Sequence, residues 1–237
     1  MELSKRLQAV ADLVTAGYMT ADIGTDHAYI PIYLIENGRI PGAVAADVNR
    51  GPLERARFNV TENGMNDRID LRISDGFSAI HPGEVRSAVI AGMGGALMVR
   101  ILTEGAETVK MLDECILQPQ SEIEKVRTFL LQEGFLFLDE VMVEEDGKYY
   151  TAMKTVPGNG TAGKETAGWN EPELRYGRLL LEKRDPVLRS FLERELRLKR
   201  EILDSLEKNE SDRIAQRKAQ LKHEIEYAEK GMEYYAL

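Results

Sequence analysis

The chain has 237 residues, of which 43% are hydrophobic and 30% charged, enough for one large domain or for a medium-sized domain with an appendage. Its single cysteine, Cys115, excludes an internal disulfide, so we expect a cytoplasmic protein in which this residue packs in the core. The net charge of −9 disfavours a nucleic-acid partner for the chain as a whole, and the sequence offers no membrane span, no metal-ligand cluster and no evident obligate protein partner.

Short apolar runs alternate with helical patterns over the first two-thirds of the chain. The expected strands are Thr20–Ile23, Gly42–Asp47, Ile69–Ser74, Ala88–Ala91 and Glu114–Leu117. The expected helices between them cover residues 28–38, 51–64, 94–109 and 121–134. Repeated strand–helix units predict an α/β fold with a parallel, doubly wound sheet.

Local signals mark the ends of these helices. Glycines at the ends of three segments are typical of helix C-caps: Gly38, Gly64 and Gly134. Gly51-Pro52 predicts one helix start, and Ser121 with Glu124 predicts another as a capping box.

The pattern changes after residue 134. The stretch "GFLFLDEVMVEEDGKYYTAMKTV" holds two extended segments around Glu145–Lys148, which predicts a β-hairpin. A parallel sheet closed by an antiparallel hairpin resembles the Rossmann-like sheet of class I methyltransferases. This likeness concerns the fold and does not by itself fix a function.

The sequence of the last third of the chain predicts a linker followed by helices. Residues 157–172 are polar and rich in glycine and threonine, so we expect one domain over 1–160, with a linker and helices over 161–237. Asp185 with Pro186 predicts a helix start, and Ser211 is a plausible cap for a second helix. Leucines at three-, four- and seven-residue spacings predict an antiparallel helical hairpin, similar to a coiled coil. Structural packing alone would also explain this pattern.

Charge is distributed unevenly. Residues 168–237 contain 15 Lys/Arg and 15 Asp/Glu, so the acidic excess lies in the first part of the chain. Residues 175–200 contain nine basic and four acidic residues, which suits contact with a polyanion as well as a solvated helix face. The candidate contacts are Arg175, Arg178, Arg189, Arg197 and Arg200.

Ligands of doubly wound sheets bind outside the carboxyl ends of the strands. The residues at these ends form the candidate site, namely Asp22, Gly24, Thr25, Asp26, His27, Asp47, Val48, Asp75, Gly76, Gly92, Met93, Gly94, Gln118 and Gln120. Asp47 suits ribose hydroxyls, and Asp75 suits an adenine amino group.

The charge of the first turn selects the cofactor. A dinucleotide would place its pyrophosphate on this turn, where Asp22 and Asp26 would repel it. S-adenosylmethionine instead brings a cationic sulfonium and an ammonium group. We therefore expect S-adenosylmethionine, and a nicotinamide cofactor is the less favoured choice.

Several motifs in order resemble those of one family. These are "LSKRL", "ADIGTDHAYIPIYL", "AADVNRGPLERARFN", "SDGF", "AGMGG" and "LQPQ", followed by the helical hairpin. Together they resemble the bacterial TrmK family over essentially the full chain. The resemblance implies a tRNA methyltransferase that modifies N1 of adenosine 22 in the D-arm.

Within that hypothesis the remaining candidates take roles. The Gly92-Met93-Gly94 turn lets backbone approach an extruded base, Asp26 stabilises positive charge on the methylated base, and Tyr29 stacks on base or cofactor. Arg6 holds the methionine carboxylate or contacts RNA, as Lys5 also can. The candidate substrate contacts are Asn59, Gln118 and Gln120. His27 either shapes the cofactor pocket or makes only a local hydrogen bond.

Two other functions stay open from the residues alone. A class I methyltransferase acting on a small molecule or a protein would use the same cofactor site. A non-catalytic tRNA-binding protein would share the fold without the reaction.

Overall fold

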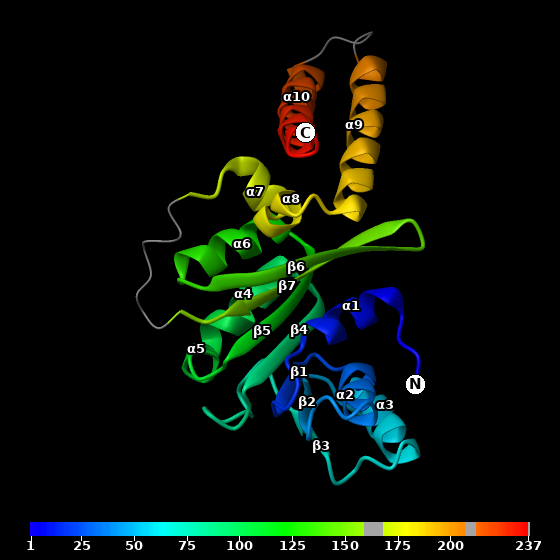
Figure 1. Cartoon of the computed structure of the whole chain (residues 1–237), viewed down its shortest axis with the longest axis vertical. Helices are drawn as coiled ribbons and strands as arrows, with labels where there is room; N and C mark the ends of the chain where they lie inside the picture. The colour runs from blue at the N-terminus through cyan, green and yellow to red at the C-terminus, as the bar shows by residue number, and fades with distance from the viewer. Residues whose placement is uncertain (159–167, 207–211, 237) are drawn as a thin grey trace. The chain divides into compact units, whose positions relative to one another are not determined.

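The computed structural model describes residues 1–158, 168–206 and 212–236. It divides into two compact units, Met1–Ala167 and Gly168–Leu237, which we describe separately (Figure 1). The boundary expected at residue 160 and the cap expected at Ser211 lie outside the described residues.

The first unit is built on one mixed sheet of seven strands. In chain order these are β1 Thr20–Ile23, β2 Ala43–Asp47, β3 Ile69–Ile73, β4 Ser87–Gly94, β5 Glu114–Ser121, β6 Leu136–Glu145 and β7 Lys148–Val156. Their order across the sheet is β3-β2-β1-β4-β5-β7-β6. The first five strands pair in parallel, whereas β7 pairs antiparallel with both β5 and β6. The expected doubly wound sheet with an antiparallel hairpin is confirmed.

Helices cover both faces of this sheet (Figure 1). They are α1 Lys5–Leu13, α2 Tyr29–Glu36, α3 Arg50–Glu62, α4 Gly95–Glu104, α5 Ala106–Val109 and α6 Ile123–Gln132. Two apolar clusters result, one between the sheet and α1–α3 and the other between the sheet and α4–α6. Cys115 is fully buried in the second cluster, and burial raises the pKa of its thiol to about 12, so this residue packs in the core as expected.

Turn chemistry explains several element ends. Asp146 and Gly147 both have positive φ, +51° and +72°, and join β6 to β7 in a two-residue hairpin as predicted. Each of the three glycines expected at helix ends also has positive φ and follows its helix directly after the C-cap residue: Gly38, Gly64 and Gly134.

Several sequence-based boundaries were wrong, and the one helix expected over 94–109 is divided into α4 and α5 at Gly105. β4 continues to Gly94 and β5 to Ser121, because Met93 still pairs with Pro119 after a bulge at Gly92. The stretch from Gly92 to Gly94 is therefore a bulged strand end and not a free turn. Ser121 belongs to β5, so the predicted capping box does not form; α6 follows Glu122, whose side chain makes no cap hydrogen bond. α3 begins at Arg50, one residue before the predicted Gly51-Pro52 start.

A buried polar cluster ties the end of α1 to the sheet. The Glu114 carboxylate, 2% exposed, accepts hydrogen bonds from the Thr15 backbone N–H at 2.8 Å and from the Ser87 hydroxyl at 2.8 Å. The same carboxylate pairs with Lys154 of β7 at 2.9 Å. These bonds fix the segment that follows α1 against residues of β4, β5 and β7. Strands β5 and β7 come more than 90 residues later in the chain than α1.

The second unit contains α7 Glu171–Tyr176, α8 Arg178–Glu182, α9 Pro186–Leu206 and α10 Asp212–Glu233. Helices α9 and α10 run in opposite directions, since Leu192 lies beside Gly231 and Lys199 pairs with Glu224 at 2.9 Å. The predicted helical hairpin is confirmed. Its apolar seam is fully or nearly buried and consists of Leu188, Leu192, Leu196, Leu221, Ile225 and Ala228.

Asp185→Ala is expected to lower the free energy of unfolding by about 1 kcal/mol, the usual value of a helix N-cap. The Asp185 carboxylate accepts hydrogen bonds from the backbone N–H groups of Val187 at 2.9 Å and Leu188 at 3.0 Å, and alanine leaves both without this acceptor. Urea unfolding followed by circular dichroism measures the change. An unfolding midpoint equal to that of the wild type would contradict this role.

In the described part of the chain, no helix is long and apolar enough to cross a membrane. The same residues bring together no group of three His, Cys, Asp or Glu side chains of the kind that holds a metal ion.

Candidate active site

The first strand places a buried carboxyl group at the carboxyl edge of the sheet. Asp22 in β1 is only 7% exposed. Burial raises the pKa of its carboxyl group to about 6; the nearby Thr25 hydroxyl lowers this pKa and the Asp47 carboxylate raises it. At neutral pH Asp22 therefore carries a poorly solvated negative charge, and a cationic ligand would stabilise it.

The turn after β1 places a glycine with positive φ and a buried hydroxyl next to Asp22. Gly24 has φ +77°, and its N–H donates to the Ala46 carbonyl at 2.7 Å. The Thr25 hydroxyl is buried, and among the described residues it meets no partner with hydrogen-bond geometry. The left-handed glycine and the buried Thr25 hydroxyl, which lies near the Asp22 carboxylate, together form the candidate cradle for a polar ligand.

Asp26 lies outside this cradle. Its carboxylate accepts two hydrogen bonds from the Arg55 guanidinium of α3, one of them from Nε at 3.0 Å, and lies 3.4 Å from His27 Nε2. The sequence predicts that Asp22 and Asp26 together present negative charge to the cofactor. In the structure Asp22 faces inward, and Asp26 is neutralised by a residue of α3.

The second and third strands supply two more carboxylates. The Asp47 Oδ1 atom accepts a hydrogen bond from the Asn49 N–H at 2.7 Å, which leaves Oδ2 for a ligand hydroxyl. Asp75 forms two hydrogen bonds with Arg100 of α4, at 2.9 and 3.2 Å, so its carboxylate is already partnered. Val48 beside Asp47 is 57% exposed, an apolar surface next to the acidic group. Gly76 has φ +56° in the next loop.

The end of β4 is held by a hydrogen-bond network. The Gln118 side-chain carbonyl accepts from the Gly92 N–H at 3.1 Å and from Arg6 Nη1 at 3.0 Å. The Arg6 guanidinium also lies over the ring of Tyr150, 5.7 Å from its centroid. Gln118 is 1% exposed, so its side chain positions the strand end and does not offer a free amide edge to a substrate. Gln120 is exposed on the same strand.

Met93 links this strand end to the first turn. A Cβ built on Gly24 would lie 1.9 Å from the Met93 terminal methyl group, so the methionine side chain rests directly on the glycine. The bulge at Gly92, with φ +79°, directs the chain at this point. The predicted residues of β1 and β4 are therefore brought together at one place.

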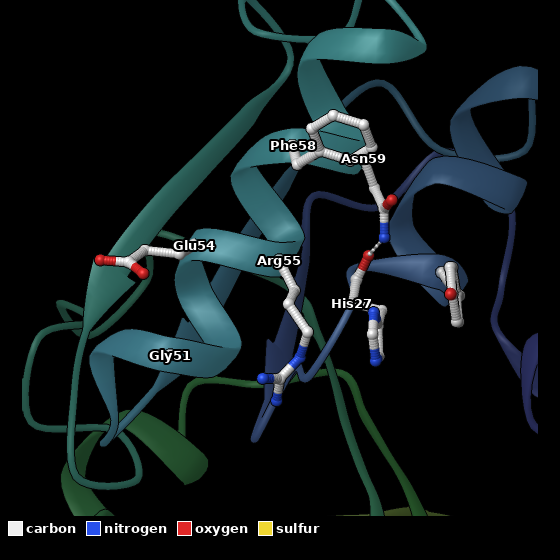
Figure 2. A pocket seen from close by; sticks show the side chains of 7 residues that line it. His27, Gly51, Glu54, Arg55, Phe58 and Asn59 are labelled. Carbon is white, nitrogen blue, oxygen red and sulfur yellow. Dashed lines mark hydrogen bonds between the residues drawn. The ribbon is translucent and has the colours of Figure 1, made fainter.

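His27 and Tyr29 form a stacked pair at the start of α2, with ring centroids 4.8 Å apart and planes 5° apart. The Asn59 side-chain amide donates to the His27 carbonyl at 2.9 Å (Figure 2). Asn59, predicted from the sequence as a substrate contact, therefore holds the loop in place.

The five arginines predicted from the basic stretch 175–200 to contact a polyanion lie in the second unit. Arg178 pairs with Glu182, Arg189 with Glu193, and Arg200 with Glu229 of α10 at 2.6 Å. Arg175 lies over the ring of Tyr227. Arg197 is exposed and has no ion-pair partner within the described ranges. Much of the local positive charge counted from the sequence is thus balanced by acidic neighbours.

Three residues of this site were not foreseen. They are Arg55, which binds Asp26, Arg100, which binds Asp75, and Tyr150, which lies under Arg6. In each pair the two residues are 25 or more positions apart in the chain. A motif describes residues that are close together in the sequence, so these distant partners can be identified only from the fold.

The strand order of the sheet is that of a class I methyltransferase, whose cofactor is S-adenosylmethionine. The acidic carboxyl edge of the sheet agrees with this class, because it favours a cationic ligand over a phosphate group. The buried charge of Asp22, which a cationic sulfonium or ammonium group would stabilise, fits that cofactor. Residues 3–153 match the family described as "Methyltransferase domain".

Known proteins narrow the class. The chain is 40% identical over 162 residues, 68% of each chain, to the tRNA (adenine(22)-N(1))-methyltransferase of Bacillus subtilis strain 168. The crystal structure of B. subtilis TrmK superposes with a TM-score of 0.83 at 32% identity, covering 98% of this chain and 99% of that one. Streptococcus pneumoniae Sp1610 in complex with S-adenosyl-L-methionine gives 0.81 at 30% identity, with 98% and 100% covered. The chain belongs to the TrmK family of tRNA (adenine(22)-N(1))-methyltransferases.

Proposed function

We infer that the protein methylates N1 of adenosine 22 in tRNA, with S-adenosylmethionine as the methyl donor, and that it acts in the cytoplasm. The observation that carries this inference is the 40% identity to the B. subtilis enzyme of that name. The poorly solvated charge of Asp22 supports it independently, because the site favours a cationic donor over a phosphate-bearing cofactor.

We assign the donor's parts to the strand ends. Asp22, Gly24 and Thr25 receive its cationic end, and Asp47 receives the ribose hydroxyls. Asp75 and Gly76 lie where the adenine would bind. Side-chain nitrogens of Arg6 and Gln120 both lie near Gly92, at 3.6 and 3.9 Å from a Cβ built there. These two residues are therefore our candidates for contact with the methionine carboxylate or with a group of the substrate.

Adenine N1 carries an in-plane lone pair, so the chain needs to expose and align the base and has no proton to remove first. When bound, S-adenosylmethionine supplies an electrophilic methyl group. The bulged end of β4 lets the backbone lie close to an extruded base, and Gln118 fixes its conformation through the Gly92 N–H. Asp26 pairs with Arg55, so we assign it to loop structure rather than to the reacting base.

The helical hairpin is our candidate for contact with the tRNA backbone. Arg197 is exposed and has no ion-pair partner in the described residues, and Arg189 and Arg175 lie on the same unit. Such contacts would read phosphate position and helix shape rather than base sequence.

The decisive experiment incubates the protein with an unmodified tRNA transcript and isotope-labelled S-adenosylmethionine, then locates the methyl group by nuclease digestion and mass spectrometry. We expect one methyl group on N1 of adenosine 22. A transcript with guanosine at position 22 is the matched control and should remain unlabelled. Methyl transfer to N6, to another nucleotide or to neither transcript would refute the assignment.

A further inference from the structure

A cavity of about 540 Å³ opens on the outer side of the first loop, between the start of α2 and the exposed side of α3 (Figure 2). Gly51, Arg55 and Asn59 are spaced four residues apart and therefore share one stripe of α3 along the cavity wall. His27 and Tyr29 form the opposite wall. None of the donor assignments above uses this cavity.

The cavity carries aromatic surface that the fold does not need. Phe58 lines it and is 65% exposed, the highest value among the large apolar side chains described. The buried side of α3 is formed by other residues, Leu53, Ala56 and Val60. Tyr29, stacked on His27, is 39% exposed and adds a second aromatic surface. Exposed aromatic rings around a cavity are typical of sites that bind planar ligands by stacking.

The charges around the cavity disfavour phosphate. Its one fixed cation, Arg55, already pairs with the Asp26 carboxylate. Glu54 also lines the cavity, is exposed, and finds no ion-pair partner in the described ranges. A neutral aromatic ligand with N–H donors at its edge fits this cavity. The Glu54 carboxylate can accept hydrogen bonds from the exocyclic amino group of such a ligand.

We propose that this cavity, lined by Phe58 and Tyr29, receives an unpaired nucleobase adjacent to the target adenosine in tRNA. The proposal rests on the proposed function and adds a second base-binding site to it. Taking the target base out of its stack also deprives its neighbours of a stacking partner, and aromatic side chains can replace that contact. The cavity starts at His27, the residue directly after Asp26, so it adjoins the loop that holds the donor.

Steady-state kinetics on full-length tRNA test the proposal with three variants of Phe58. We expect Phe58→Ala to raise KM for tRNA about five-fold or more, with kcat and the Kd for S-adenosylmethionine unchanged. Phe58→Leu should behave like alanine, whereas Phe58→Trp should keep the wild-type KM, since stacking needs a ring. Leu138→Ala, at a 55% exposed position on β6, is the matched control and should have no effect.

A fluorescent base gives a direct readout. With 2-aminopurine in place of the nucleotide on either side of the target, binding of wild-type protein should quench fluorescence at one of the two positions, and Phe58→Ala should abolish that quenching. Unchanged KM and unchanged quenching in Phe58→Ala would overturn the proposal. A weaker affinity of Phe58→Ala for S-adenosylmethionine would also overturn it, because the cavity would then belong to the cofactor site. A wild-type dimer that Phe58→Ala dissociates would overturn it as well, because the cavity would then bind a second copy of the chain.

The two levels of inference can fail separately. If wild-type protein methylates no tRNA, the proposed function falls, and the cavity proposal falls with it. If wild-type protein methylates adenosine 22 and the Phe58 variants match it, only the cavity proposal is refuted.

Discussion

Asp22→Asn is expected to abolish measurable S-adenosylmethionine binding while making the cofactor-free protein more stable at pH 7. The Asp22 carboxyl is 7% exposed, and its pKa is raised from 3.8 to about 6, chiefly by burial. This shift corresponds to about 3 kcal/mol of destabilisation once the group is ionised, and asparagine removes up to that amount. The same substitution removes the charge that attracts a cationic donor.

The pH dependence follows from the direction of this shift. Because the folded state holds the Asp22 proton more tightly than the unfolded state, the contribution of this group to stability falls as pH rises from about 4 to about 6. Donor affinity should follow the opposite trend and increase through pH 6 as the carboxylate ionises. In Asp22→Asn both trends should be lost.

Thermal unfolding from pH 4 to 8 and isothermal titration with S-adenosylmethionine measure these effects. Asp67→Asn, which removes one negative charge from an exposed position, is the matched control and should change neither. If Asp22→Asn binds the donor as wild type does, the electrostatic account of the cofactor site is wrong.

Gly24→Ala is expected to weaken donor binding at least a hundred-fold. The residue has φ +77°, which costs an L-amino acid about 1–2 kcal/mol. The new methyl group would also lie 1.9 Å from the Met93 terminal methyl, so that side chain must move into the space beside the donor. Titration calorimetry measures the loss of affinity, and circular dichroism checks that the protein remains folded.

A matched glycine separates these two causes. Gly38 has φ +65°, and a Cβ there meets nothing within 4 Å, so Gly38→Ala reports backbone strain alone. Gly38→Ala should lose about 1–2 kcal/mol of stability and keep donor affinity. Adding Met93→Ala to Gly24→Ala relieves the steric clash. Full recovery of binding in that double variant would show that Met93, rather than the lost backbone approach, caused the defect.

Most of the fold could be predicted from local patterns. Strand–helix alternation and the Asp146-Gly147 turn depend on residues close together in the sequence, and the structure agrees with both. The ends of β4 and β5 were missed because their last residues are paired through Met93 and Pro119, a contact between strands that neither segment signals alone.

The candidate site was predictable in its location but less so in its charges. The rule that ligands bind at strand ends identified Asp22 and Asp47. The sequence could not reveal that Arg55 would neutralise Asp26, since that arginine lies 29 residues further along the chain. Gln118 looked like a substrate contact because glutamine amides often face ligands, yet the fold uses it to hold Gly92.

The docking of α1 has a consequence for synthesis on the ribosome. Arg6 leaves the exit tunnel well before Tyr150 and Lys154, its own partner and that of the segment after α1, because these two residues belong to β7, the last strand of the sheet in chain order. The nascent chain therefore cannot complete its reaction centre step by step as it is translated. Assembly is expected as a single late event, once β7 has inserted between β5 and β6.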